Sequence, residues 1–569
     1  MSWGRISTRR LYLLLGIALL GPIGTTHIAR AQSPANIPTS PRTSPHKPST
    51  FEEFVSATIA QEQRLTKLMR NFKPIVETYI QEQKSDPDVL TSPKDDIYFL
   101  SRVRLNGNEL DVRDFETRER GKLDRTKLLR RVKEPIFDAE DFAQAVFPDL
   151  GHFDRQNYEF TLVRWEMVNE VRCIVIDVTP REGTDNRRFI GRLWVEDQDN
   201  NVVRFTGTYT AKGYSKHPFH FDSWRLNTLG NMWMPAYIYS QESDPNDPAS
   251  HGLWFKAQTR IWGYDLQQAG DHREYSKPLT DNPAAADPNR GESSQNLSPQ
   301  LTVGGSTYSP EDQVVERLQL AGLMAADGDV DRILETVVNN LQVTNNLDIA
   351  GVRCRVLLTT PLESFVVGRT IVLSRGLLDV LPDEATLAAV IAHEFAHIVL
   401  KHSLGAENSP RFHPSFSDME VFTKLDFRFA AAKEAEADIK GQELFSKSPY
   451  GDKIAKVALF VQALQARSAQ LPKLMQGRFS NDFASSHLVG MQAVASSPKA
   501  LRMNQSNQIA ALPLGSRIKL DPWSDKIEML KTQSPPPLTA SEKRPFEVSP
   551  FFPYLKRQEE EKPQAKAAQ

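Results

Sequence analysis

His393, Glu394 and His397 lie at the centre of the stretch AAVIAHEFAHIVLKHS, residues 388–403. In a helix, residues four apart lie on one face, so the two imidazoles point the same way. The spacing H-E-x-x-H is that of a zinc site in which both histidines bind the metal and the glutamate acts on a water molecule. The surrounding residues are apolar almost all round, which predicts a buried helix. Burying polar groups without partners costs several kcal/mol, and a bound zinc ion would offset that cost. The alternative is two buried histidines with local partners.

A zinc hydrolase needs a third protein ligand and an open fourth position. The extended pattern H-x-x-G-x-x-H does not supply it, because Leu400 and Ser403 stand where the glycine and the last histidine belong. His402 lies well round the helix from the ligand face, so we interpret it as a helix cap or as a group that supports a ligand. The third ligand is therefore expected on a following helix.

The stretch LDFRFAAAKEAEADIKGQELFSK, residues 425–447, supplies that helix. One stripe at helical spacing is apolar, small or acidic, and a second stripe alternates in charge, as expected of a solvated face. Glu434 and Asp438 belong to the first stripe, whereas Glu436 belongs to the second. We therefore predict Glu434 as the third ligand and Asp438 as the carboxylate that orients a ligand histidine. The first stripe comprises Phe427, Ala431, Glu434, Asp438, Gly441 and Phe445.

The composition limits the protein class. The chain has 569 residues, of which 40% are hydrophobic and 25% charged, and a formal net charge of −2. This balance gives no support to a nucleic-acid partner. Its two cysteines, Cys173 and Cys354, exclude a disulfide scaffold and a cysteine-rich zinc site.

The N-terminus has the features of an export signal. Arg5, Arg9 and Arg10 precede the apolar run LYLLLGIALLGPIG, and Ala29-Arg30-Ala31 fits a small-x-small cleavage site. We predict a cleaved signal peptide over residues 1–31 and a location in the periplasm or cell envelope, with a single N-terminal membrane anchor as the alternative. The run TRRLYL leaves general secretory and twin-arginine export open.

Composition and periodicity divide the rest of the chain and predict an α+β, multidomain protein. A linker over 32–50 precedes a β-rich region over 51–267, which begins with helical spacing from Phe51 to about Gln83 that Pro74 ends or kinks. A second linker, 268–308, leads to a mainly helical metallopeptidase domain with a small sheet over 309–530. A disordered tail is expected over 531–569.

Segments rich in β-branched and aromatic residues predict a curved antiparallel sheet in the β-rich region. In MWMPAYIYS both faces are apolar, so the sheet is expected either to be covered by a helix or to enclose a cavity. The sequence alone does not decide between an ordinary hydrophobic core and a lipid-binding cavity. The predicted strands are YEFTLVRWEMV, VRCIVIDV, FIGRLWVED, NVVRFTGTYT, MWMPAYIYS and LWFKAQTRIWGY.

HEFAH followed by EAEAD resembles the zinc endopeptidase (gluzincin) family that includes the bacterial HtpX and BepA proteins and the CAAX prenyl proteases. The preceding RTIVLSRGLLDVLPDEATLAAVIAHE is also similar to that family, and the resemblance covers about residues 310–500. The chain departs from the family at Glu363-Ser364-Phe365, where Asn-Ala-Phe is common. It departs again at SSHLVGMQAV, which keeps Ser486-His487 but lacks the family's proline and arginine. His487 is either a group that faces the zinc or a plain loop histidine.

The resemblance implies a zinc metalloendopeptidase with one Zn²⁺ per chain on His393, His397 and Glu434. Glu394 would act as general base and acid on the metal-bound water. An extended, unfolded polypeptide would pair with a strand edge in FVVGRTIVLS, which suits quality control of envelope proteins, with membrane-surface or outer-membrane assembly partners. Two other hypotheses remain: a zinc-stabilised chaperone whose proteolysis is blocked, and a lipid or lipoprotein carrier built on the β-rich region.

Overall fold

The protein is described by a computed structural model that covers residues 48–557 with gaps. These residues belong to one compact unit, Pro48–Gln569. No helix among them is long and apolar enough to cross a membrane. The segments outside the description are 1–47, 116–136, 184–186, 211–217, 229–231, 251, 265–301, 304–305, 308–309, 405–421, 487, 489–500, 503, 506–507, 516, 531–543 and 558–569.

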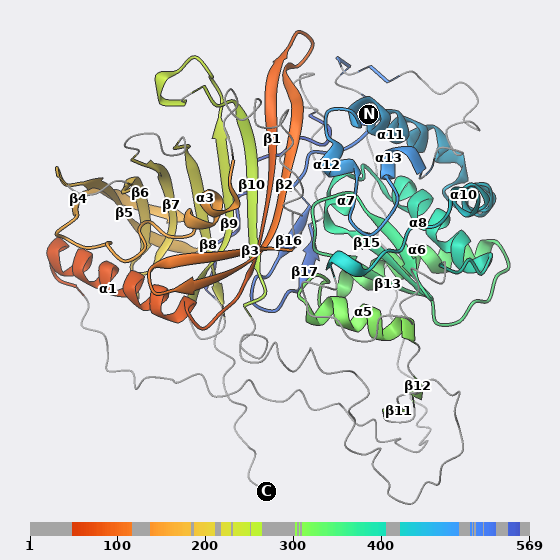
Figure 1. Ribbon diagram of the computed structural model, residues 1–569, viewed down its shortest axis with the longest axis horizontal. Helices are drawn as coiled ribbons and strands as arrows, with labels where there is room; N and C mark the ends of the chain where they lie inside the picture. Colours follow the sequence, from red (N-terminus) through yellow and green to blue (C-terminus); the bar gives the residue numbers. More distant parts are fainter. Residues whose placement is uncertain are drawn as a thin grey trace, which may run out of the picture. The chain divides into compact units, whose positions relative to one another are not determined.

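A ten-stranded antiparallel sheet forms the first half of the described chain, in the order β3-β2-β1-β10-β9-β8-β7-β6-β5-β4 (Figure 1). Its strands are rich in β-branched and aromatic residues, which suit a pleated and partly buried surface. The strands are β1 (Ile75–Asp86), β2 (Leu90–Asn106), β3 (Glu109–Asp114), β4 (Tyr158–Val168), β5 (Val171–Pro180), β6 (Phe189–Glu196), β7 (Val202–Tyr209), β8 (Phe221–Thr228), β9 (Met232–Glu242) and β10 (Phe255–Trp262).

Both faces of this sheet are buried at β9, as the sequence of that strand predicts. Helices α1 (Phe51–Met69) and α3 (Ala139–Gln144) cover one face and share an aromatic core with Met234 and Ile238. Trp233 and Tyr237 belong to the other face. The apolar pocket beside the end of α1 measures about 20 Å³, which is room for about one water molecule. This pocket cannot hold an acyl chain, so it gives the lipid-carrier hypothesis no support.

Two predictions about the ends of this region are wrong. Helix α1 ends at Met69, which agrees with a helix that ends at Pro74, but the helical spacing predicted up to about Gln83 is wrong because the residues after Pro74 form strand β1. Pairing of β1 with both β2 and β10 decides their conformation. The predicted disorder of 531–569 is also wrong for 544–557, which cross the second face of the sheet and bury Phe546 and Leu555.

The segment 544–557, called the C-terminal strap below, is held by specific polar contacts. The side-chain amide of Gln81 in β1 donates to the carbonyl of Phe546 at 2.8 Å. The carbonyl oxygen of the same amide accepts the backbone N–H of Val548, also at 2.8 Å. Lys256 and Glu547 form a buried ion pair with 2.8 Å between Nζ and Oε2. These contacts give the polar groups of the strap their partners. The partners lie on β1 and β10, so the proline- and charge-rich sequence of the C-terminal region does not reveal them.

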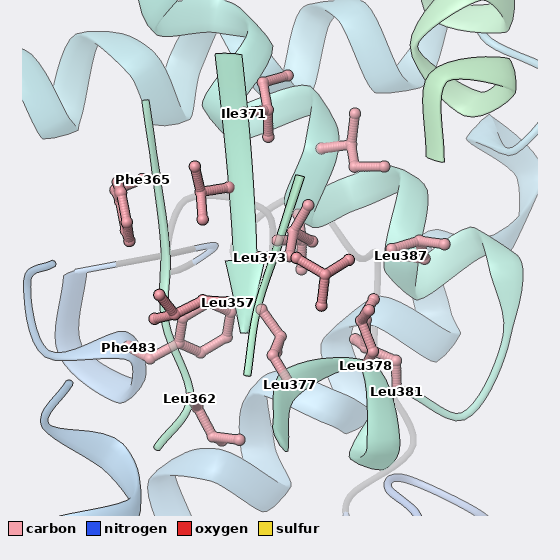
Figure 2. Packing of buried hydrophobic residues seen from close by; sticks show 14 of the residues in the cluster. Leu357, Leu362, Phe365, Ile371, Leu373, Leu377, Leu378, Leu381, Leu387 and Phe483 are labelled. Carbon is pink, nitrogen blue, oxygen red and sulfur yellow. The ribbon is translucent and has the colours of Figure 1, made fainter. Parts of the chain in front are cut away.

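The helical half of the chain surrounds a three-stranded sheet in the order β13-β15-β14. Leucines from this sheet meet leucines from the surrounding helices in one core (Figure 2). The α+β fold class predicted from the sequence is therefore confirmed. The principal elements are α5 (Pro310–Leu320), α6 (Asp329–Thr344), β13 (Arg353–Leu357), β14 (Ser364–Val367), β15 (Thr370–Ser374), α7 (Arg375–Val380), α8 (Glu384–Val399), α10 (Ala431–Ser446), α11 (Ile454–Arg467), α12 (Pro472–Met475), α13 (Phe483–Ser486), β16 (Ile518–Leu520) and β17 (Ile527–Met529). Short pairings β11 (Thr302–Val303) and β12 (Ser306–Thr307) precede α5.

A buried polar cluster joins the large sheet to the helical half. The carboxylate of Glu77 in β1 accepts from the guanidinium of Arg375 in α7 at 2.7 Å. It also accepts from the backbone N–H of Thr360 at 2.5 Å, from the hydroxyl of Thr360 at 2.8 Å and from the hydroxyl of Tyr98 at 2.9 Å. Arg375 further contacts Asp379 at 3.3 Å. Because a buried charge is tolerated only when it is paired and hydrogen-bonded, this cluster fixes how the two halves meet.

Candidate metal centre

Helices α8 and α10 carry the predicted site residues and lie close together. Asp383 caps α8 by accepting the backbone N–H of Thr386 at 2.9 Å. A Cβ atom at Gly441 of α10 would lie 2.9 Å from the Cα of His393. Only glycine permits this approach, in agreement with the small residues on the buried stripe of the sequence. The tight packing brings the acidic side chains of α10 up to the histidines of α8.

The structure brings His393, His397 and Glu434 together. One ligand atom from each lies within 4.8 Å of the others. Nε2 of His393 lies 3.2 Å, and Nε2 of His397 lies 4.0 Å, from Oε2 of Glu434. All three side chains are buried, with relative exposures of 0%, 2% and 7%. This is the arrangement that the helical stripes predict.

Each histidine is oriented through its other ring nitrogen. Nδ1 of His393 lies 2.8 Å from Oδ1 of Asp438, so the carboxylate holds the proton there and leaves Nε2 toward the site. Nδ1 of His397 lies 3.0 Å from Nδ1 of His402, and Nε2 of His402 lies 3.2 Å from Glu436. These contacts hold the Nδ1 side of both histidines and leave both Nε2 atoms facing the site, where each can bind a metal ion once it carries no proton.

Asn481 orients the glutamate and was not predicted from the sequence. Its side-chain amide donates to Oε1 of Glu434 at 2.7 Å. Within the described part of the chain, the buried Oε2 of Glu434 accepts no hydrogen bond. An oxygen left in this state between two imidazoles is costly unless a cation fills the site. Two neutral imidazoles and one carboxylate are the donor set of a catalytic zinc site, so these residues fit a zinc ion.

Glu394 is held by the start of strand β14. The hydroxyl of Ser364 lies 2.6 Å from Oε1 of Glu394, and both side chains are buried. Ser364 is one of the residues at which the chain departs from the family pattern that it resembles. A hydroxyl there fixes one oxygen of the carboxylate, which is the group expected to move protons.

The pKa values of the two histidines are shifted in opposite directions. Burial lowers the pKa of His393, but its hydrogen bond to Asp438 and the nearby carboxylate of Glu434 outweigh burial and raise the pKa to about 10. Burial lowers the pKa of His397 to about 4. Without a metal ion, His393 therefore carries a proton on both ring nitrogens at neutral pH, whereas His397 stays neutral. A bound metal ion would replace the Nε2 proton of His393. Such an environment favours a cation at the point where the ligand atoms converge.

Phe429 covers the site from the chain that leads into α10. Its ring stacks on that of His397, with 4.1 Å between centroids and 13° between planes. Glu394 is only 1% exposed. Of the other predicted residues, His402 and Asp438 touch the ligands, whereas His487 lies outside the described residues. The aromatic cover, like Asn481 and Ser364, depends on segments that meet only in the folded chain.

Replacing Asp438 by alanine is expected to weaken zinc binding by about 10- to 100-fold, the usual cost of removing a partner that orients a ligand histidine. Competition with a chromogenic chelator measures this change. Glu443→Ala is the matched control, because Glu443 lies on the same helix and pairs with Lys440 and Lys447 at its surface. Equal affinities for the two variants would contradict the role of Asp438.

Comparison with known proteins bears on this half of the chain. The model of Peptidase family M48 matches residues 325–409. The matched segment runs from before α6 through β13, β14, β15 and α7 and past the end of α8, so it contains His393, Glu394 and His397. It supports an M48 metallopeptidase in general terms.

The remaining comparisons add no functional argument. No curated protein matches the chain. A crystal structure of a DUF1329 family protein from Desulfovibrio piger matches with 13% sequence identity and a TM-score of 0.19. The match covers 37% of this chain and 93% of that chain. At this TM-score it carries no argument about fold or function.

Proposed function

We propose that the protein is a zinc-dependent metalloendopeptidase, of the HtpX and BepA type, that cleaves unfolded or extended polypeptides. The observation that carries this proposal is the convergence of His393, His397 and Glu434 beside a positioned Glu394. Two imidazoles and a carboxylate leave a fourth coordination position for a substrate or a water molecule, as in catalytic zinc sites. The M48 match over the same helix supports the reaction class.

A zinc ion held by this set supplies a Lewis acid and lowers the pKa of a water molecule toward about 7. The residues of the chain do the rest. Asp438 and His402 hold the ligand imidazoles in one tautomer, and Asn481 holds the carboxylate of Glu434. Glu394 accepts the proton of the attacking water and then delivers it to the leaving amine. Ser364 keeps that carboxylate aimed during both transfers.

Substrate is expected to bind along strand β14. This strand lies at one edge of the three-stranded sheet and pairs with β15 on its other side. An extended peptide can add to such an edge through backbone hydrogen bonds. This mode of binding requires an unfolded segment and gives little sequence selectivity. The N-terminal export features support an exported or envelope location and quality control of proteins there, including assembly partners at the membrane surface.

A chaperone with blocked proteolysis is the second candidate, and the burial of Glu394 and the stacking of Phe429 on His397 favour it. Client rescue by a Glu394→Gln protein separates this candidate from the first. A chaperone keeps its activity in that variant, whereas a peptidase loses it.

The proposal is tested first by metal content. Protein purified without a histidine tag is expected to carry about one zinc per chain by mass spectrometry, as three-ligand coordination requires. Glu434→Ala is expected to lose the metal, and Glu443→Ala to keep it, because Glu443 lies on the exposed side of the same helix. Wild-type protein without zinc, or a Glu434→Ala protein that retains it, would overturn the proposal.

A further inference from the structure

A cavity of about 740 Å³ lies beside the candidate metal centre. Its walls come from the residues that lead into β14, from the segment before α10, from the loop after α12 and from Tyr98 of β2. It is therefore built by both halves of the chain. A space of this volume is within the range of ligand-binding pockets.

One contact and one chain neighbour connect the cavity to the reacting groups. Asn481 lines the cavity and donates to Glu434 at 2.7 Å. Glu363 also lines it and directly precedes Ser364, which contacts Glu394. The cavity thus adjoins both a predicted metal ligand and the predicted proton carrier.

Basic side chains exceed acidic ones in the cavity wall. The acidic ones are Glu363, Asp426 and Asp482, and the chain's own groups engage all of them. Asp426 pairs with Arg428 at 3.0 Å, and Asp482 accepts the backbone N–H of Ala484 at 2.9 Å. The basic side chains are Lys424, Arg428, Lys473 and Arg478.

Glu363 contributes less negative charge than an exposed carboxylate would. Its Oε1 accepts the backbone N–H of Phe479 at 2.6 Å, and burial raises the pKa of the carboxyl to about 7. At neutral pH it is therefore partly protonated. With the Asp426–Arg428 pair set aside, Lys424, Lys473 and Arg478 outnumber Glu363 and Asp482, and this excess of positive charge attracts a carboxylate.

The large sheet holds the wall that carries Lys473. Oδ1 of Asp96 in β2 accepts the backbone N–H of Lys473, and Oδ2 accepts that of Leu474, both at 2.8 Å. The backbone N–H of Leu362 donates to the carbonyl of Leu474 at 2.7 Å, so this wall is also tied to the segment that enters β14. The sheet thereby fixes where Lys473 stands relative to the predicted substrate strand.

We propose that this cavity is a substrate pocket that takes an aspartate or glutamate side chain flanking the scissile bond, and that the large sheet forms one of its walls. The proposal rests on the peptidase function proposed above. It makes the β-rich region part of substrate selection instead of a separate binding module.

Peptides test the pocket directly. Cleavage sites in unfolded casein are first mapped by mass spectrometry with the full-length wild-type protein. Fluorogenic peptides that span one mapped site then carry aspartate, asparagine or lysine at each flanking position in turn. At one position, kcat/KM is expected to be at least about tenfold higher for aspartate than for asparagine, since a charge-assisted contact contributes on the order of 1.5–3 kcal/mol.

Charge reversal separates the pocket from the overall charge of the protein. Lys473→Glu is expected to abolish or invert the ratio between the aspartate and asparagine peptides. Lys67→Glu, the same change on the exposed surface of α1, is expected to leave that ratio as in wild type. Wild-type cleavage with equal kcat/KM for the three peptides, or an unchanged ratio in Lys473→Glu, would overturn the pocket and leave the peptidase standing. No cleavage of casein by zinc-loaded wild type would instead overturn the peptidase function.

Discussion

Replacing Glu394 by glutamine is expected to lower kcat for peptide hydrolysis by about 10²- to 10⁴-fold, the usual contribution of a positioned acid–base group. Glutamine keeps the size of the side chain and can still accept the hydroxyl of Ser364, which lies 2.6 Å from Oε1. It cannot take a proton from water. The loss should therefore appear in turnover, measured with a fluorogenic peptide, and not in the fold.

Two controls identify the origin of that loss. The Glu394→Gln protein should contain as much zinc as wild type, because Glu394 is not among the residues that converge on the metal position. Ser364→Ala should give a smaller loss, of about tenfold, since it removes a group that only aims the carboxylate. Wild-type turnover in Glu394→Gln, with zinc present, would show that another group moves the proton.

Replacing Glu77 by alanine is expected to lower the free energy of unfolding by about 3–5 kcal/mol, the cost of leaving a buried charge without its partner. Arg375 has no exposed surface, and its guanidinium lies 2.7 Å from Glu77. Thr360 and Tyr98 would lose an acceptor in the same place. Urea denaturation followed by tryptophan fluorescence measures the change.

Glu82→Ala is the matched control on the same strand. Glu82 pairs with Lys94 at 3.8 Å near the surface, and such pairs contribute about 0–1 kcal/mol. If Glu77→Ala unfolded at the same urea concentration as Glu82→Ala, the cluster would not be what fastens the sheet to the helical half.

The three metal ligands could be predicted because helical periodicity determines which residues share one face of a helix. His393 and His397 lie one turn apart, and the spacing of Glu434 and Asp438 among small residues places both on the buried side of their helix. The contacts of Asn481 and Ser364 could not be found in this way. Each bonds to a residue far away in sequence, and no local pattern records which loop will face the site. Glu436 was assigned to the solvated face, where its side chain is 64% exposed, but its contact with His402 was missed.

The strands show the same division between local and tertiary information. The alternation in MWMPAYIYS and the aromatic residues of YEFTLVRWEMV predict strands β9 and β4. The sequence did not predict β1: helical spacing was extended to about Gln83 with an end or kink at Pro74, and β1 is rich in polar residues such as Glu77 and Gln81. Those residues are buried by partners from the helical half and from the C-terminal strap. Composition alone assigns such polar residues to the surface, because it gives no information on the distant residues that pair with them in the fold.

The C-terminal strap has a consequence for synthesis. Gln81 and Phe546, which the strap joins, are 465 residues apart in sequence. Contacts of such separation form late, after the cost of closing a long loop. Residues 544–557 must therefore be synthesised before the second face of the sheet is covered. Until then the tryptophans of that face and Lys256 remain exposed to water. A nascent or truncated chain therefore exposes an aggregation-prone apolar surface that is covered in the folded protein.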